Sequence, residues 1–222
     1  PEQAAVEGEM PIDRVMQGWS YYTIAASYHE LGRYDTAMEY LKRVTQIAHR
    51  ERNDRLKVAG LHSLGAVLAA VGDPRRAIEC YQEVLTSAPG SDSEAAATLA
   101  GLASAYRDLG EMERAIGYYE KAISHAQAIG DRRLQGAVLT SLGNAYRRLG
   151  RVKDAIDLYQ EALCIARDVC NRGSEGTILG NLGIAHRNLG NPHRAIQFPL
   201  SAVIIRKVIC HRTRLGEALN NL

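Results

Sequence analysis

The chain has 222 residues, of which 46% are hydrophobic and 23% are charged, an ordinary composition for a folded protein in water. Its 27 Lys and Arg residues nearly balance its 25 Asp and Glu residues, and the net charge of +2 argues against nucleic acid or an anionic membrane as partner. No apolar run approaches the ~20 residues that cross a bilayer, so no membrane-spanning helix is predicted.

The first segment, residues 1–13, contains two prolines and three glutamates and predicts a linker or the tail of an upstream element. Because the sequence begins with Pro1 rather than Met, we expect it to be a fragment of a longer chain. The remainder, residues 14–222, predicts an array of helix pairs. The expected units are 15–54, 55–92, 93–132, 133–172 and 173–212, with a partial sixth at 213–222.

A Leu-Gly or Val-Gly dipeptide ends each predicted first helix and sets the repeat. Its glycines, spaced by 40, 38, 40 and 40 residues, are Gly32, Gly72, Gly110, Gly150 and Gly190. Glycine adopts the left-handed conformation that ends a helix. In Gly72-Asp73-Pro74 and Gly190-Asn191-Pro192 the next helix is predicted to begin with a polar cap and a proline.

Other positions recur in phase with these glycines. A small residue precedes each glycine by seven residues and an alanine follows it by five, so the two antiparallel helices of a unit can approach closely. The residue nine positions after the glycine is large until the fifth unit, in the order Leu41, Tyr81, Tyr119, Tyr159 and Pro199. No unit buries its apolar face alone, so the units must stack.

The fourth unit carries the clearest signature, with Leu142-Gly143, Tyr146, Leu149-Gly150, Ala155, Tyr159 and Ala162. This pattern resembles the tetratricopeptide (TPR) repeat over nearly the whole chain, from about residue 15 onwards. The resemblance implies an all-α fold, a right-handed α-solenoid of stacked antiparallel helix pairs. The 40-residue unit is similar to the extended repeats of Pins-type adaptors and kinesin light chains, and equally to the repeat arrays of bacterial signalling proteins.

Three segments depart from the pattern. The loop-rich stretch 87–93, with Pro89, predicts a shorter second helix in the second unit. Pro199 lies inside a second helix and lacks the N–H for its backbone bond, so it is expected to kink or split that helix. Residues 214–222 repeat the phase of residues 174–182, so the sequence is expected to stop halfway through a sixth first helix.

No constellation in the sequence predicts catalysis, a cofactor or a metal. The seven histidines occupy different phases, and neither a metal-ligand spacing nor a phosphate-binding loop is present. The cysteines, which form no CxxC pair, are Cys80, Cys164, Cys170 and Cys210. We expect four free thiols in a cytoplasmic protein that is not an enzyme.

The concave wall that TPR first helices form is the candidate binding site that the resemblance implies. Helical spacing selects residues that share a face but avoid the packing stripe. The candidates are Trp19, Tyr22, His29, His62, Ser104, Arg107, Thr140, Asn144, Arg147, Arg148, Thr177, Arg187 and Asn188.

Three of these arginines, Arg107, Arg147 and Arg187, recur at one phase and predict a ladder of guanidinium groups that pairs with carboxylates. Asn144 resembles the groove asparagine that holds the ligand backbone in related TPRs. Trp19, Tyr22 and His29 predict an aromatic patch at the amino end. The expected partner is an acidic protein segment, extended or helical. The alternatives are a solvated basic face without a ligand, a sensor array of a larger signalling protein, and end-to-end self-association through the last unit.

Overall fold

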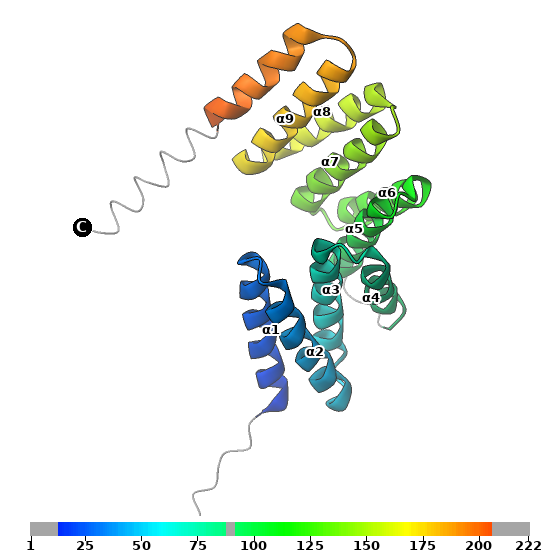
Figure 1. The fold of residues 1–222 in the computed structure, drawn as a ribbon, viewed down its shortest axis with the longest axis vertical. Helices are drawn as coiled ribbons and strands as arrows, with labels where there is room; N and C mark the ends of the chain where they lie inside the picture. Colours follow the sequence, from blue (N-terminus) through cyan, green and yellow to red (C-terminus); the bar gives the residue numbers. More distant parts are fainter. Residues whose placement is uncertain (1–12, 88–91, 206–222) are drawn as a thin grey trace, which may run out of the picture. The chain divides into compact units, whose positions relative to one another are not determined.

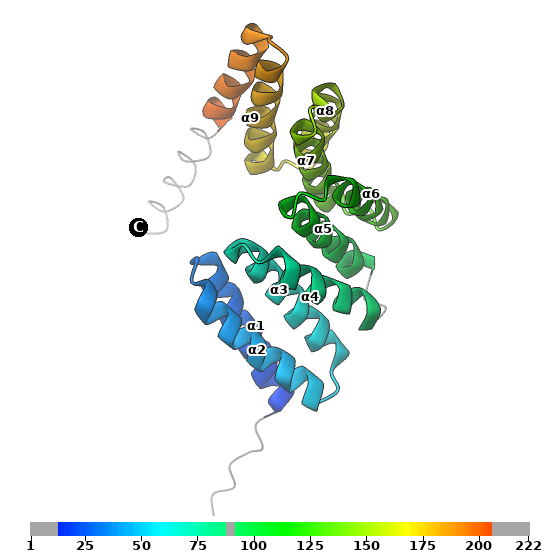
Figure 2. The ribbon, with the colours of Figure 1, turned by 45° about the vertical axis from the view of Figure 1, so that its right-hand side comes forward.

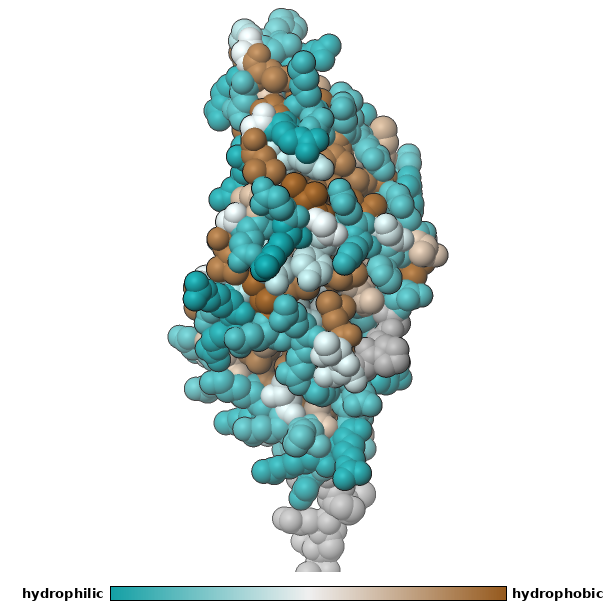
Figure 3. Space-filling model, turned by 90° about the vertical axis from the view of Figure 1, so that its right-hand side faces the viewer, coloured by the Kyte–Doolittle hydropathy of each residue, from teal (hydrophilic) through white to brown (hydrophobic). Residues whose placement is uncertain are grey.

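The computed structural model describes residues 13–87 and 92–205, and every regular element in these ranges is a helix (Figures 1 and 2). The chain divides into two compact units at Gly90–Ser91. No helix of the described ranges is long and apolar enough to cross a membrane. On the face drawn in Figure 3, hydrophilic side chains are interspersed with smaller apolar areas.

The first unit contains four helices, α1 (Arg14–Glu30), α2 (Tyr34–Arg50), α3 (Asp54–Val71) and α4 (Pro74–Ser87). Helix α1 packs on α2, α2 on α3 and α3 on α4, and the first helices α1 and α3 also touch. Its core includes Ala25, Ala37, Leu41 and Val67. Helix α4 is described as far as Ser87, and Pro89, on which the predicted shortening of this second helix rests, lies outside the described residues.

The second unit contains α5 (Asp92–Asp108), α6 (Met112–Ala128), α7 (Arg132–Arg148), α8 (Val152–Asp168) and α9 (Arg172–Asn188). A further helix covers residues 192–205. The helices pack in consecutive antiparallel pairs, and the first helices α5, α7 and α9 also contact their neighbours of the same kind. The all-α stack of helix pairs predicted from the repeat is therefore confirmed.

The turn inside each unit has the predicted geometry. All five phase-setting glycines have positive φ, between 69° and 91°. The next helix begins as expected in the second and fifth units, where the Asp73 side chain accepts a hydrogen bond from the Arg76 amide and Asn191 accepts one from the Arg194 amide. First helices are capped as well. The Asn53, Asp131 and Asn171 side chains each accept a bond from a backbone amide three residues later.

Close approach within each unit explains the small residue of the first helix. A Cβ added at Gly143 would lie 2.6 Å from the Tyr159 ring, and one added at Gly65 would lie 2.8 Å from the Tyr81 ring. In the fifth unit the ring of Pro199 takes the place of tyrosine, 2.6 Å from the Cβ position of Gly183. The helix of residues 192–205 is continuous through Pro199, so the proline does not split it.

A buried carboxylate joins α8 to α9. Glu175 accepts hydrogen bonds from Arg167 Nε at 2.8 Å and from Arg172 Nη1 at 2.7 Å. Burial raises the pKa of Glu175, but the hydrogen bonds and charges of the two arginines outweigh burial and hold that pKa below its ordinary value. The pair of arginines thus keeps a charged group stable at the inter-repeat contact.

His186 of α9 is buried at the position where the third and fourth units have tyrosine. Its ring stacks on Phe198 at 5.3 Å, and neither ring nitrogen has a hydrogen-bond partner among the described residues. Burial, and then the charge of Arg194, lower the pKa of His186 below its ordinary value of 6.5. The folded unit therefore holds this histidine neutral.

We expect the second unit to lose stability as the pH falls below 6.5, because the unfolded chain then binds a proton that the folded chain excludes. The free energy of unfolding should fall by at most about 1.4 kcal/mol per pH unit from this group. Urea unfolding between pH 7.5 and pH 5 measures the slope. The variant His186→Phe should have a flatter pH dependence, and an unchanged slope would contradict this role of His186.

Candidate functional site

The predicted site residues of the first unit lie on α1 and α3. Trp19, 39% exposed, meets Tyr22 edge to face with ring centroids 5.7 Å apart. His29 instead contacts Tyr34 of α2, and His62 meets the buried Tyr81 of α4 edge to face. The structure therefore brings Trp19 and Tyr22 together, while His29 and His62 contact second helices.

In the second unit, the Arg107 side chain already bonds to other residues of its own chain. Its Nε donates to Asp108 Oδ1 at 3.0 Å, and its Nη1 donates to the Tyr119 hydroxyl at 3.2 Å. The same hydroxyl lies 3.0 Å from Ser104 Oγ. Because Asp108 compensates its charge and its side chain is only 23% exposed, Arg107 is a weaker candidate for binding a partner carboxylate.

The equivalent cluster of side chains in the fourth unit contains no counterpart of the Asp108 carboxylate. The Tyr159 hydroxyl donates to Asn144 Oδ1 at 2.7 Å, which leaves the Asn144 amide NH2 as a donor. Burial raises the pKa of Tyr159, and the neighbouring Arg147 guanidinium lowers it only in part through a hydrogen bond and its charge. Arg148 stands where the third unit has Asp108. Arg147 has no ion pair within residues 92–205, and its Nε is buried without a hydrogen-bond partner there.

The fifth unit has neither the tyrosine nor the asparagine, because Pro199 and Ile184 occupy those positions. Arg187 and Asn188 are consequently exposed, and so is Arg148 at the end of α7. Within the described part of the second unit no ion pair involves Arg148 or Arg187. The positive charge of the arginine ladder is thus uncompensated at the ends of α7 and α9 and neutralised at the end of α5.

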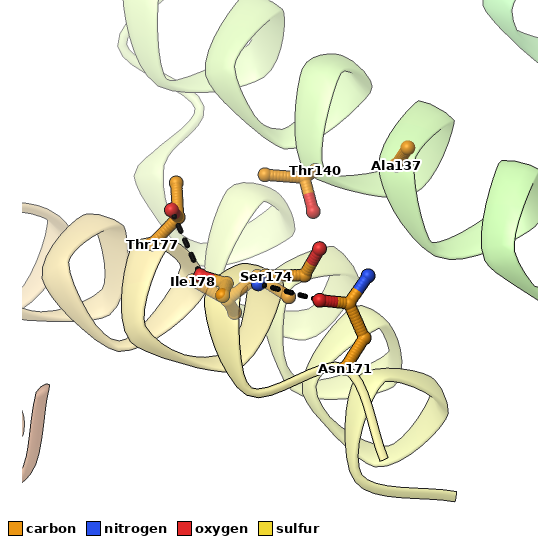
Figure 4. Close-up of a pocket in the computed structure, with 7 residues that line it drawn as sticks. Ala137, Thr140, Asn171, Ser174, Thr177 and Ile178 are labelled. Atoms are coloured by element: carbon orange, nitrogen blue, oxygen red, sulfur yellow. Dashed lines mark hydrogen bonds between the residues drawn. The ribbon is translucent and has the colours of Figure 1, made fainter. Parts of the chain in front are cut away.

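A pocket of about 460 Å³ lies between α7 and α9 (Figure 4). It lies in the N-terminal halves of both helices, whereas the arginines are at their C-terminal ends. It is lined by Ala137, Thr140, Asn171, Gly173, Ser174, Thr177 and Ile178. The predicted site contained Thr140 and Thr177 but missed the residues at the start of α9. The available signal was the replacement of Arg133 and Leu134 of α7 by Gly173 and Ser174 at the same phase of α9.

The hydroxyls of the buried tyrosines were also missed as parts of the site. Tyr119 and Tyr159 were predicted as packing residues, which they are, yet each hydroxyl also holds a polar residue and an arginine of the facing first helix. A signal for this contact was present in the sequence. Ser104 and Asn144 each directly follow the small residue of their first helix, and the second helix of the same unit carries a tyrosine. These contacts fix where the arginines point.

Groups able to hold a metal ion are absent from residues 13–87 and 92–205. Cys80, Cys164 and Cys170 are free thiols, and burial raises the pKa of Cys80 to about 11. Cys210 lies outside the described residues. The only chemistry that the first-helix face displays in the described ranges is that of hydrogen bonding, charge and apolar contact.

Several solved structures share this fold. A putative kinesin light chain with nearly identical TPR-like repeats from Podosopora anserina superposes with a TM-score of 0.72 at 19% identity, covering 90% of this chain and 100% of that chain. Aspartyl phosphate phosphatase F from Bacillus subtilis gives a TM-score of 0.77 at 16% identity, covering 92% of this chain and 55% of that chain.

A third similar structure is a signal transduction ATPase with numerous domains and a tetratricopeptide repeat sensor, from Pyrococcus horikoshii. Its TM-score is 0.69 at 19% identity, covering 79% of this chain and 28% of that chain. At such identities these likenesses concern the fold alone. No curated protein sequence matches the chain significantly.

The family assignment rests on the sequence profile of the tetratricopeptide repeat, which matches residues 16–90 and again residues 94–168. These two matches cover most of the helix pairs described above, and the structures of similar fold include other TPR proteins. The resemblance predicted from the fourth unit is confirmed. The chain belongs to the tetratricopeptide repeat family, and its fold is that of a protein-interaction module.

Proposed function

We propose that the second unit binds an acidic segment of a partner protein on the face formed by α7 and α9. The observation that carries the proposal is that Arg147, Arg148 and Arg187 have no carboxylate partner within residues 92–205, whereas the equivalent Arg107 is paired with Asp108. A guanidinium fork matches a carboxylate in shape and charge. The free NH2 of Asn144 adds a donor for the ligand backbone.

The magnitudes are sufficient for useful binding. A hydrogen bond to a charged group contributes about 1.5–3 kcal/mol, and micromolar affinity corresponds to about 8 kcal/mol. Two arginine–carboxylate contacts with a few backbone hydrogen bonds therefore reach that range. Exposed charges are screened, so the affinity should also fall as salt is added.

Replacing both arginines, as Arg147→Gln/Arg187→Gln, should weaken binding of an acidic peptide about 100-fold, because each lost contact removes about tenfold in Kd. Fluorescence anisotropy measures this with a labelled Gly/Ser peptide that carries several Glu residues. Its Gln counterpart should bind neither protein measurably.

The matched control is Lys121→Gln/Lys153→Gln, which removes the same charge from exposed positions of the second helices α6 and α8. Circular dichroism should show the same helix content in all three proteins. Equal affinity of the two double variants for the acidic peptide would contradict the proposal, since the arginines would then be an ordinary solvated face.

A second candidate role is self-association. The helix of residues 192–205 exposes an apolar stripe made of Ile196, Leu200, Val203 and Ile204, each at least half exposed. Ile196 and Val203 occupy the phase of Ile156 and Leu163, which are buried in the core shared with α9. Stacking of copies through this stripe would make the molecular mass in light scattering rise with concentration, and a constant monomer mass would exclude it.

The sensor role is a third candidate, favoured by the fold shared with the ATPase that carries a TPR sensor. A sensor would bind its partner on the same face of α7 and α9 as an adaptor would. The two roles differ only in whether the bound segment controls an effector domain. An effector domain in the same polypeptide would distinguish a sensor array from a free adaptor.

A further inference from the structure

The pocket between α7 and α9 exists because the second and third residues of α9, Gly173 and Ser174, are small. At the corresponding phase, α7 has Arg133 and Leu134, whereas α9 has Gly173 and Ser174. Gly173 contributes no side chain and Ser174 only a short one, so the space beside Ala137 of α7 remains open. The opening thus depends on residues of α9 that differ from those of α7 at the same phase.

The lining of the pocket is suited to an apolar group. The Thr140 hydroxyl donates to the Gly136 carbonyl at 2.8 Å. The Thr177 hydroxyl donates to the Gly173 carbonyl at 3.2 Å, and Asn171 Oδ1 accepts from the Ser174 amide (Figure 4). With these groups used inside the protein, the exposed lining is mainly carbon and carries no charge. A charged side chain would lose its water there without gaining a partner.

The pocket and the arginines lie on the same first helices at a distance that a short peptide can span. Thr140 and Arg147 are separated by seven residues of α7, about 10 Å, and Thr177 and Arg187 by ten residues of α9, about 15 Å. An extended chain advances about 3.3 Å per residue, so it covers these distances in three to five residues.

We propose that the bound segment carries an apolar residue three to five positions from an acidic one. The apolar side chain fills the pocket of Ala137, Thr140, Ser174, Thr177 and Ile178, while the carboxylate pairs with Arg147 or Arg187. This inference rests on the proposed function and adds the second point of recognition. The uncompensated charge at one end and the uncharged carbon surface at the other define the chemistry of the partner.

The test uses three labelled Gly/Ser peptides and the full chain. The first has a Leu about four residues from a pair of Glu, the second has Ser in place of Leu, and the third has Gln in place of both Glu. The pocket is filled in the variant Gly173→Gln/Ser174→Leu, which adds no charge. A Cβ at Gly173 would meet only Asn171 Oδ1 at 3.6 Å, an ordinary contact, and α7 carries large residues at both positions, so the fold should tolerate the change.

We expect the wild-type chain to bind the Leu peptide about tenfold more tightly than the Ser peptide, and the filled variant to bind both equally. If Leu gives no gain over Ser, or if the filled variant keeps the gain, the pocket proposal is wrong while the acidic site stands. If the Gln peptide binds as well as the Glu peptide, the acidic site itself fails. The two failures are therefore distinguishable in one set of titrations.

Discussion

The variant Tyr159→Ala is expected to lose about 3–5 kcal/mol of unfolding free energy, the usual cost of deleting a fully buried aromatic ring. Tyr159 is completely buried, its ring fills the space over Gly143, and its hydroxyl donates to Asn144. Alanine would leave a cavity between α7 and α8 and an unsatisfied amide oxygen. Urea unfolding followed by circular dichroism measures the loss.

The companion variant Tyr159→Phe separates the two contributions. It keeps the ring and removes only the hydroxyl, so it should cost about 1 kcal/mol, the net worth of one hydrogen bond. Because the hydroxyl also contacts Arg147, acidic-peptide binding should change in this variant as well. A Tyr159→Ala protein within 1 kcal/mol of wild type would show that the repeat core described here is wrong.

The second large expected effect is a gain in the free energy of unfolding. Pro199→Tyr is expected to raise the unfolding free energy by about 2–3 kcal/mol, because a proline in a helix interior costs about 3 kcal/mol. The replacement restores the backbone N–H that can donate to the Ala195 carbonyl. The new ring would pack on Gly183 as Tyr159 packs on Gly143.

The variant Pro199→Ala isolates the backbone part of this gain, since it restores the N–H without adding a ring. It should recover less stability than Pro199→Tyr because alanine leaves the space beside Gly183 empty. If Pro199→Tyr is no more stable than wild type, the proline ring is already a good substitute for tyrosine in the fifth unit, and the argument from the missing backbone hydrogen bond fails.

The periodic residues predicted most of the fold. Glycine at a fixed phase ends each first helix, and an alanine five residues later allows the second helix to approach, so the helix pairs follow from spacing alone. Pro199 shows the limit of such rules, because the helix is not split there, and the proline ring packs on Gly183 of the facing helix.

The candidate site was predictable only in outline. The repeat spacing predicts that Arg107, Arg147 and Arg187 lie on one face, but it does not distinguish between them. The distinction depends on the neighbouring residue: Asp108 neutralises Arg107, and Arg148 adds charge beside Arg147. Spacing along one helix cannot show that a tyrosine of the facing helix reaches these side chains, because that contact depends on rotamers and on the distance between helices.

The pocket could not be predicted for a similar reason. It arises because Gly173 has no side chain and Ser174 only a short one, next to a helix forty residues earlier in the sequence. A comparison of α7 with α9 at equal phase reveals the small residues, but only the packed structure shows that nothing else fills the space.

Nuclear magnetic resonance shows directly whether the face of α7 and α9 binds the Leu- and Glu-containing peptide, through chemical-shift changes when the peptide is added to the isotope-labelled chain. We expect the Asn144 side-chain NH2 and the Nε–H signals of Arg147 and Arg187 to shift on titration. The Nε–H signal of Arg151, paired with Asp154 at the start of α8, should stay in place. If the signals of Asn144, Arg147 and Arg187 do not move at saturating peptide, the face of α7 and α9 is not the binding site.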